Sequence, residues 1–457
     1  MELTKTLRSE IENGIAELGM NFSSFGERSG INRGIFSAIL NGTPPKPISL
    51  NQMEAITRAF GKPEGWMFDL YIEECFYDGK PNRRRVEPFL IRCAELGRTD
   101  CIREVLSRLL EDLKHVSMIF DIAETLFTTG RKQESLIFYE CVVENEKYHH
   151  SERLAISYYR LFHAALGEDN EQNWRAAMRF EPFSGKLPDH YRLDGLLKLA
   201  NVYLLLERWT EVELYSTELH EFVQAIYEIE KKKARKNSSQ KPIPTERPLI
   251  FYYGHSFILR EAVYEQEGNY EAARQCIDAY KDLSDFELPL DKSGRAEVEN
   301  FKLYAKANEM NLEVLAGNMD VLDAYTEFLD ENPDEVLPSF LTVLECANKY
   351  EASIDPFVDH FSPALQSYNI NTLNYKRTSS LNRYASIFYE LARYHFRQKR
   401  YDRALSYALQ CLEMTVKISN KNIFMKSVPL FEELRSFANA EQTKTYENLM
   451  RSVYLNV

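Results

Sequence analysis

The sequence predicts an all-α protein in which a five-helix N-terminal domain precedes a long, right-handed helical solenoid. Apolar residues recur at helical spacing along nearly the whole chain. Small residues, glycines and aromatics return at similar offsets in several places, which indicates stacked helical repeats. Aromatic residues make up 12% of the 457 residues and suit the gaps between paired helices.

The acidic composition limits what the whole chain can bind. The net charge is −13 and the pI is about 5.4, so any contact with nucleic acid must be local. The 7 cysteines stand singly, which indicates reduced thiols and no disulfide framework. No apolar stretch reaches the roughly 18 residues of a membrane span, and the N-terminus lacks an apolar signal core. We therefore expect a cytoplasmic protein without a membrane partner.

Residues 1–75 are predicted to hold five short helices. The first ends at Gly19, a natural C-cap, and a second over residues 22–29 is broken by Gly30. Asn32 can cap a third helix, which an Asn-Gly pair ends. Two short helices joined by a tight, glycine-centred turn form a helix-turn-helix, whose second helix can lie in the DNA major groove. The stretches SLNQMEAITRAFG and PEGWMFDLYI supply the remaining two helices.

The exposed face of the third helix carries the predicted DNA contacts. Arg33 is the best candidate for a guanine edge, and Ile35 for a thymine methyl group. Asn41, Thr43 and Lys46 would lie near phosphates. The full set of predicted DNA-contacting residues is Asn32, Arg33, Gly34, Ile35, Ser37, Ala38, Asn41, Thr43 and Lys46. The alternative is a helical bundle that docks only to protein.

The charge of the N-terminal domain predicts weak binding by a single copy. Residues 1–62 hold seven basic and six acidic residues, a net charge of +1. Few phosphate contacts give low affinity, and two copies on a two-fold site would correct this. We therefore expect a homodimer, formed through the apolar C-terminal end of the chain.

Residues 76–85 are predicted to be a connector, and residues 86–457 a solenoid of helix pairs. The full pattern is a small residue, then an aromatic three positions on, a glycine seven on, an aromatic or apolar residue nine on and an alanine twelve on, and the copies in this chain are degenerate versions of it. The clearest turn is Gly268–Tyr280, within EGNYEAA. Further copies are predicted at residues 123–142, 200–219 and 392–411, and weaker ones at 93–110, 161–178 and 317–322.

One segment interrupts the repeat pattern. Residues 228–248 (EIEKKKARKNSSQKPIPTERP) are charged, then rich in serine and proline, with no expected core positions. We predict a mobile insertion there, whose basic run is a solvated loop or, alternatively, touches DNA.

No catalytic or metal-binding motif is present in the sequence. It contains no GxxxxGK[ST], GxSxG, HExxH or paired-cysteine motif, and His149-His150 lack companion ligands nearby. We expect no enzyme activity, no metal and no cofactor.

Residues 20–42 resemble the lambda-repressor-like (Xre-type) helix-turn-helix. That pattern runs apolar-S-Q-x-x-L-A-x-x-x-G-I-S-x-x-x-I-S-x-I-E-N-G, and this chain shares its spacing of Gly30-Ile31-Asn32 and Ile39-Leu40-Asn41-Gly42. Phe22 replaces the usual glutamine, which often touches DNA. Gly34 falls inside the predicted recognition helix, where glycine costs roughly 1 kcal/mol relative to alanine.

The two halves together resemble the RRNPP group of cytoplasmic peptide-pheromone receptors of Gram-positive bacteria. Residues 86–457 are similar to tetratricopeptide proteins, and arbitrium receptors of phages share the layout. The resemblance implies a quorum-sensing transcriptional regulator that binds double-stranded DNA as a homodimer. It also implies that the solenoid binds a short signalling peptide on its concave surface and so alters DNA binding.

The concave face should offer partners for a peptide backbone. Asn side chains supply both donor and acceptor groups, and basic side chains can take a terminal carboxylate. Counting along the first helix of each repeat gives the candidates Asp194, Asn201, Leu205, His255, Gln266, Tyr304, Asn308, Asn311, Tyr389, Arg393 and Arg397. Asn201 and Arg393 are the strongest of these.

Two other functions fit the same layout. The solenoid could bind a protein partner in place of a peptide. Alternatively, the chain could resemble the solenoid phosphatases of two-component relays, which need a catalytic side chain in their N-terminal bundle. The match of the N-terminal domain to a DNA reader disfavours the second.

Overall fold

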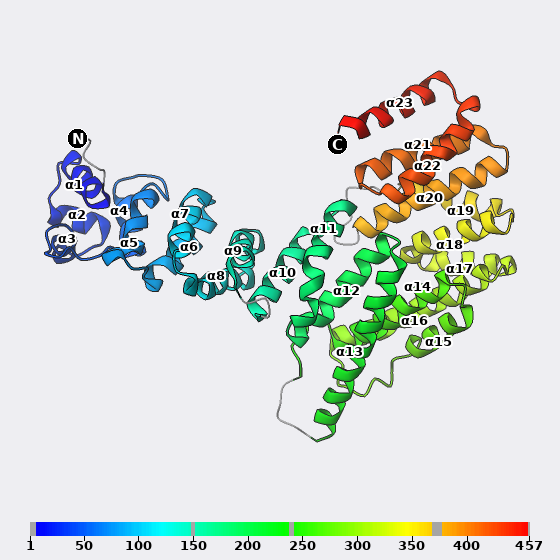
Figure 1. Cartoon of the computed structure of the whole chain (residues 1–457), viewed down its shortest axis with the longest axis horizontal. Coiled ribbons are helices and arrows are strands. Elements are labelled where there is room, and N and C mark those ends of the chain that lie inside the picture. Colours follow the sequence, from blue (N-terminus) through cyan, green and yellow to red (C-terminus); the bar gives the residue numbers. More distant parts are fainter. Residues whose placement is uncertain (1–5, 148–150, 237–241, 368–376, 456–457) are drawn as a thin grey trace. The chain divides into compact units, whose positions relative to one another are not determined.

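The computed structural model describes residues 6–147, 151–236, 242–367 and 377–455, and all regular structure in these ranges is helical (Figure 1). The chain divides into two compact units, residues 1–164 and 165–457. The helices of unit 1 are α1 (Leu7–Glu17), α2 (Phe22–Ser29), α3 (Arg33–Leu40), α4 (Leu50–Ala59), α5 (Phe68–Cys75), α6 (Arg83–Glu95), α7 (Thr99–Leu109), α8 (Val116–Thr128), α9 (Lys132–Asn145) and α10 (Glu152–Ala165).

Unit 2 begins at Ala165, the last residue of α10. Its helices are α11 (Asn170–Phe180), α12 (Asp189–Leu205), α13 (Trp209–Arg235), α14 (Leu249–Gln266), α15 (Tyr270–Tyr280), α16 (Lys292–Leu315), α17 (Leu322–Glu331), α18 (Val336–Lys349), α19 (Asp355–Ser367), α20 (Arg377–Arg397), α21 (Tyr401–Lys417), α22 (Lys421–Leu434) and α23 (Ala440–Leu455).

The corner between α2 and α3 is set by two glycines and a cap. Gly30 ends α2 with a φ of 72°, a conformation that only glycine adopts without strain. The Asn32 side chain accepts a hydrogen bond of 2.7 Å from the backbone N–H of Gly34 and so begins α3. A Cβ at Gly26 would lie 2.7 Å from the carbonyl oxygen of Ile31, so the two segments approach closely there.

A buried ion pair holds α3 against the helices around it. Glu74 is 2% exposed, and Arg8 reaches it from α1 at 2.6 Å. Arg8 also donates from Nε to the carbonyl oxygen of Ile39 at the end of α3, at 3.1 Å. The second carboxylate oxygen of Glu74 accepts from the backbone N–H of Ile48 at 2.8 Å. The pair is therefore hydrogen-bonded on both sides, as a buried charge requires.

The predicted connector does not separate two compact units. The Phe89 ring of α6 lies 5.2 Å from Phe68 and 5.1 Å from Tyr71, both on α5. One hydrophobic core runs from Leu7 to Val142. The boundary between the compact units falls between residues 164 and 165 instead of at residues 76–85, because aromatic packing joins α5 to the first helix pair.

Unit 2 is built from stacked helix pairs. The helices α12, α14, α16, α18, α20 and α22 pack side by side in this order, and α13, α15 and α21 pack against α12, α14 and α20 respectively. Small residues allow the close approaches. Gly254 of α14 lies under the ring of Phe301 of α16 and leaves no room for a Cβ. This is the packing expected of a helical repeat.

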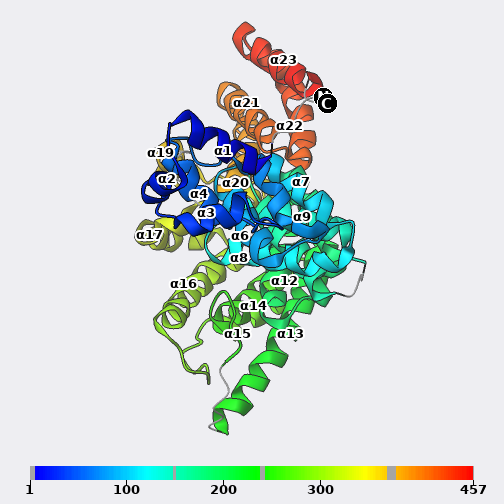
Figure 2. The same cartoon turned by 90° about the vertical axis from the view of Figure 1, so that its left-hand side faces the viewer.

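The interruption predicted at residues 228–248 is partly wrong. The helix α13 continues to Arg235 and projects past its neighbours (Figure 1 and Figure 2). Glu230 is 7% exposed, so the segment does contribute buried positions. Lys231 and Arg235 bind Glu287 at 2.7 and 2.5 Å, so these charges belong to helix-surface ion pairs. Residues 237–241 lie outside the described residues.

The stack of unit 2 closes on itself. Three asparagines from distant parts of the sequence meet at the join, and all are less than 9% exposed. The Nδ2 atoms of Asn170 (2.7 Å) and Asn420 (2.8 Å) both donate to Oδ1 of Asn382, and Asn382 donates back to Asn170 at 3.2 Å. The backbone N–H of Asn170 also donates to the carbonyl oxygen of Ile418 at 3.0 Å.

Further polar contacts line the same join, which we call the seam: α11 and the end of α12 on one side, and α20, α21 and α22 on the other. Ser419 donates to Asp169 at 2.6 Å, and Lys421 binds Glu171 at 2.6 Å. The side chains of Asn422 and Lys426 reach the carbonyl oxygen of Leu206 (3.0 Å) and the carboxylate of Glu207 (3.1 Å). The seam is therefore held largely by hydrogen bonds and ion pairs.

Replacing Asn382 with alanine should weaken the seam. The amides of Asn170 and Asn420 would lose a buried partner, which costs about 1–3 kcal/mol. We expect a lower thermal unfolding midpoint, measured by circular dichroism. The matched control is Asn201→Ala, an exposed site expected to change stability by less than about 0.5 kcal/mol. Equal midpoints for the two variants would contradict a stabilising role for the asparagine cluster.

Candidate functional site

The residues predicted to contact DNA lie on one side of α3 and in the loop after it. Seven are exposed (Asn32, Arg33, Gly34, Ser37, Asn41, Thr43 and Lys46), and Ile35 and Ala38 are half-buried. The opposite side of the helix is anchored by Phe36 and Ile39, both 0% exposed. The backbone N–H of Lys46 donates to the carbonyl oxygen of Ala38 at 2.8 Å, which folds the loop back onto the helix.

Two details of α3 differ from the sequence-based expectation. The helix begins at Arg33, so Gly34 lies in its first turn and not in its interior. Its N–H is not part of the helical hydrogen-bond ladder, because Asn32 accepts it. The amide oxygen of Asn32 therefore already accepts a hydrogen bond within the protein, so its NH₂ group is the part available to donate to a base.

Several predicted groove residues serve the structure of unit 2. Asp194 is 4% exposed and lies 3.4 Å from Lys198. Asn308 donates to the hydroxyl of Tyr280 at 2.9 Å. Asn311 is 8% exposed, and the hydroxyl of Tyr325 donates to its Oδ1 at 2.8 Å. These polar groups satisfy buried neighbours within the stack, which a count along the helices could not reveal.

Other candidates have different surroundings. The Nδ1 atom of His255 lies 3.0 Å from the carbonyl oxygen of Phe251, and burial lowers the pKa of His255 to about 4, so its imidazole is neutral. Tyr304 is half-buried, as is Leu205 at the end of α12. Asn201 and Gln266 are exposed. The structure does not gather these residues into a single pocket.

The structure does bring three candidates together. Tyr389, Arg393 and Arg397 of α20 line a pocket of about 450 Å³ between α18, α20 and α22, which we call the α20 pocket. Asn348 of α18 and Lys426 of α22 also line it. The sequence pattern did not indicate these two residues, because they belong to helices with no recognisable repeat pattern. The volume lies in the range of small-ligand sites.

Ion pairs occupy two of the five charged side chains that line this pocket, Arg393 and Lys426. Both carboxylate oxygens of Glu390 accept from Nη1 of Arg393, at 3.1 and 3.0 Å. The amide of Asn348 donates to Glu390 at 2.7 Å. Lys426 is held by Glu207 across the seam at 3.1 Å. The pocket therefore lies directly beside the join of unit 2.

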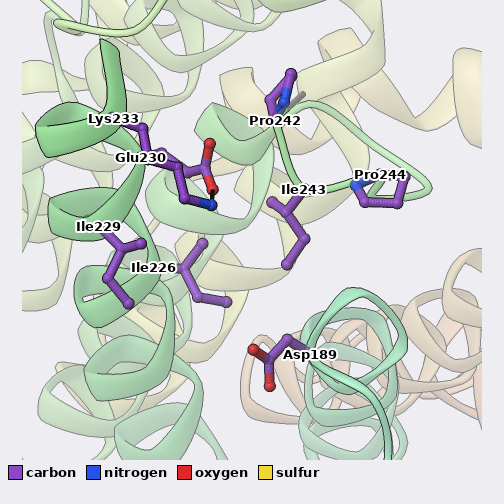
Figure 3. Close-up of a pocket in the computed structure, with 8 residues that line it drawn as sticks. All are labelled: Asp189, Ile226, Ile229, Glu230, Lys233, Pro242, Ile243 and Pro244. Atoms are coloured by element: carbon purple, nitrogen blue, oxygen red, sulfur yellow. Dashed lines mark hydrogen bonds and ion pairs between the residues drawn. The ribbon is translucent and has the colours of Figure 1, made fainter. Parts of the chain in front are cut away.

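A second pocket of about 390 Å³ lies where α13 projects (Figure 3). Figure 3 shows Ile243 opposite Ile226 and Ile229 of α13, with Lys233 paired to Glu230 at 2.7 Å. Its lining is mainly apolar and includes no residue predicted from the sequence as a binding site. Ile243 belongs to the predicted insertion, and its side chain is half-buried in this pocket.

A small acidic cluster in unit 1 does not favour a metal. Asp69, Asp100 and Cys101 lie within metal-ligand reach of one another. Arg98, however, binds Asp69 at 2.5 Å and Asp100 at 2.7 Å and so already engages both carboxylates. His149 and His150 lie outside the described residues.

Two carboxylates on α14 lie in a desolvated environment. Glu261 is 2% exposed and accepts a hydrogen bond from the hydroxyl of Tyr280 at 2.7 Å, and burial raises its pKa well above the usual value. Glu265 lies one turn further on, and desolvation raises its pKa from 4.5 to about 7. Both carboxyl groups therefore resist ionisation in the folded chain.

Comparison with known proteins identifies one repeat. Residues 385–415, in α20 and α21, match the tetratricopeptide repeat family. The repeat predicted at residues 392–411 is thus confirmed, although Gly268–Tyr280 looked clearer in the sequence. Unit 2 contains tetratricopeptide-like helical repeats. No curated protein shows significant similarity to the chain.

One solved structure aligns with most of the chain. It is described as a "circular tandem repeat protein with novel repeat topology and enhanced subunit contact surfaces", with 12% identity over 97% of this chain and 90% of the other. Its TM-score is 0.15, which does not indicate a common fold. Among the described residues, every helix is too short or too polar to cross a membrane.

The raised pKa of Glu265 predicts a pH-dependent stability. The unfolded chain ionises this group near pH 4.5, whereas the folded chain holds the proton until about pH 7. Its contribution to stability is therefore complete below pH 4.5 and is lost as the pH rises through 7. Since glutamine never ionises, Glu265→Gln should raise the thermal unfolding midpoint relative to wild type more at pH 8 than at pH 5.

The control for this measurement is Glu327→Gln, an exposed glutamate on α17. We expect the same difference from wild type at both pH values for that variant. The groups that act on or around Glu265 are Glu261, Tyr280, Tyr325 and Cys346. A pH-independent effect of Glu265→Gln would show that its carboxyl group titrates normally.

Proposed function

We propose that this protein is a cytoplasmic, homodimeric transcriptional regulator that binds double-stranded DNA through α3 and a short signalling peptide in unit 2. The proposal includes no catalytic role. It joins the Xre-type pattern of residues 20–42 to the tetratricopeptide-like repeats of unit 2.

The observation that carries the DNA-binding half is the exposed face of α3. Arg33 has no hydrogen bond or ion pair among the described residues, so its guanidinium is available for a base edge. The tight corner before α3 and the ion pair of Arg8 with Glu74 keep the helix rigid. A rigid recognition helix loses little conformational entropy when it binds DNA.

The α20 pocket supports the peptide half. It combines cationic side chains, an asparagine and the aromatic ring of Tyr389 in one concave site. The guanidinium of Arg393 lies 5.7 Å from the centroid of that ring. Such a site suits a short peptide, whose backbone needs hydrogen-bond partners and whose terminus carries a charge.

The seam offers a way to couple the peptide to DNA binding. A ligand shifts a protein between two shapes only if it binds them with different affinities. Lys426 lines the α20 pocket and also bonds to Glu207 across the seam. A ligand that competes for Lys426 would weaken the closed shape of unit 2. The direction of the effect on transcription follows from which shape binds DNA better.

A protein partner is the second candidate for unit 2. Met425 on α22 is 71% exposed and Leu214 on α13 is 56% exposed, and both are apolar. Exposed apolar side chains of this size favour contacts with protein surfaces. The α20 pocket is the better-defined feature, so the peptide stays the first proposal.

Replacing Arg33 with alanine should reduce DNA affinity by roughly 10- to 100-fold, because a bidentate arginine–guanine contact contributes about 1–3 kcal/mol. The measurement is a gel shift at fixed salt on the DNA flanking the protein's own gene. Arg103→Ala, an exposed arginine on α7, is the matched control and should leave affinity unchanged. Equal losses in both variants would argue against reading by α3.

The peptide half predicts a loss of ligand binding when the α20 pocket is changed. Arg393→Ala removes a charged partner and should weaken peptide binding by about 10- to 100-fold, whereas Asn201→Ala, at an exposed site of α12 outside that pocket, should change it by less than about threefold. The ligands are synthetic C-terminal peptides from any short reading frame beside the gene, measured by isothermal titration calorimetry. Unchanged affinity in both variants would move the ligand site elsewhere.

A further inference from the structure

The pocket beside the projecting end of α13, which we call the α13 pocket, has mainly apolar walls (Figure 3). Ile226 of α13 is 5% exposed, whereas Ile229 is 51% exposed and forms an open rim. Ile243 faces both of them from the opposite side. The volume of about 390 Å³ lies at the lower end of the range for small-ligand sites, so the pocket suits one long side chain.

The wall opposite α13 offers few hydrogen-bonding groups to a ligand. Pro242 and Pro244, which line the pocket, have no backbone N–H. The carbonyl oxygen of Ile243 already accepts from the backbone N–H of Thr245 at 3.0 Å. This wall therefore favours an aliphatic chain over a polar one.

Two of the three charged side chains that line the α13 pocket neutralise each other. Lys233 binds Glu230 at 2.7 Å, and Glu230 is 7% exposed. An anionic ligand would have to break this pair to reach Lys233, which would leave a nearly buried carboxylate without its partner. The pocket therefore disfavours anions.

The third charged side chain of the lining, Asp189 at the start of α12, has no such partner. It is exposed and, among the described residues, makes no side-chain hydrogen bond or ion pair. Figure 3 shows its carboxylate below Ile226 and Ile243, away from the pair of Glu230 and Lys233. One uncompensated negative charge thus lies beside an aliphatic surface, which is complementary to an aliphatic chain that ends in a cation.

We infer that the α13 pocket binds a lysine side chain from a segment of a partner protein, with the ammonium group at Asp189 and the methylene chain between Ile226 and Ile243. Ile229, Pro242 and Pro244 are exposed at the rim, where they can cover apolar residues on either side of that lysine. The projection of α13 past its neighbours leaves room for such a segment (Figure 2). The site is separate from the α20 pocket and goes beyond the function proposed above.

The test uses the full-length protein with labelled isoleucine δ1 methyl groups, observed by methyl NMR. The probes are three N-acetylated tripeptide amides, Leu-Lys-Leu, Leu-norleucine-Leu and Leu-Glu-Leu; norleucine has nearly the aliphatic chain of lysine without its charge. The lysine peptide should shift the methyl signals of Ile226, Ile229 and Ile243, each identified by an Ile→Val substitution. It should bind about three- to tenfold more tightly than the norleucine peptide, and the glutamate peptide should bind most weakly.

Two variants separate the charge from the apolar surface. Asp189→Asn keeps the size of the side chain and should abolish the preference for lysine over norleucine. Ile229→Ser, at an exposed position, should weaken the binding of both peptides by a similar factor and keep that preference. The control Glu327→Gln, on α17, should behave as wild type.

Three outcomes would overturn the inference. A lysine preference that is absent, or that survives Asp189→Asn, would remove Asp189 from the site. No shift of the three methyl signals with any peptide would show that the pocket binds no such segment. The probe n-butylammonium lacks a peptide backbone and should bind at least about tenfold more weakly than the lysine peptide. Equal binding of the two would assign the pocket to free amines instead of a partner protein.

Discussion

The closure of unit 2 depends on the cluster of Asn170, Asn382 and Asn420. These amides are buried, and they hydrogen-bond to one another across the join between α11 and the helices α20 and α22. A stack of helix pairs has two ends, which usually face solvent. Here the polar seam joins them, and the positions of α18, α20 and α22 around the α20 pocket follow from that closure.

A polar join differs physically from an apolar core. Hydrogen bonds and ion pairs exchange readily for contacts with water, so their net contribution is small even when each is well formed. Buried asparagines nevertheless fix one register, because any shift leaves their amides unpaired. The seam therefore combines a specific closed geometry with a modest cost of opening, which is the property a ligand-controlled shape needs.

Unit 1 has the opposite character. Its core is continuous from Leu7 to Val142, and aromatic contacts between α5 and α6 join the DNA-reading candidate to the first helix pairs. The buried pair of Arg8 and Glu74 makes the N-terminal part of this unit rigid.

The amino-acid sequence by itself determined the helical class, the corner between α2 and α3, and the repeat at residues 392–411. These features depend on local signals: helical periodicity, a left-handed glycine, a capping asparagine and a spacing of small residues. The exposed face of α3 followed from the same periodicity, because Phe36 and Ile39 point to the core.

Only the tertiary structure decided which polar groups are free. Asp194, Asn308 and Asn311 looked like Asn201 in the sequence. Asn308 and Asn311, however, bond to neighbouring helices, Asp194 pairs with Lys198 one turn further along α12, and Asn201 is exposed. The seam joins residues about 250 positions apart, and the α20 pocket takes side chains from three helices, α18, α20 and α22. No local pattern encodes such contacts, because they arise from how the helices stack and where the stack closes.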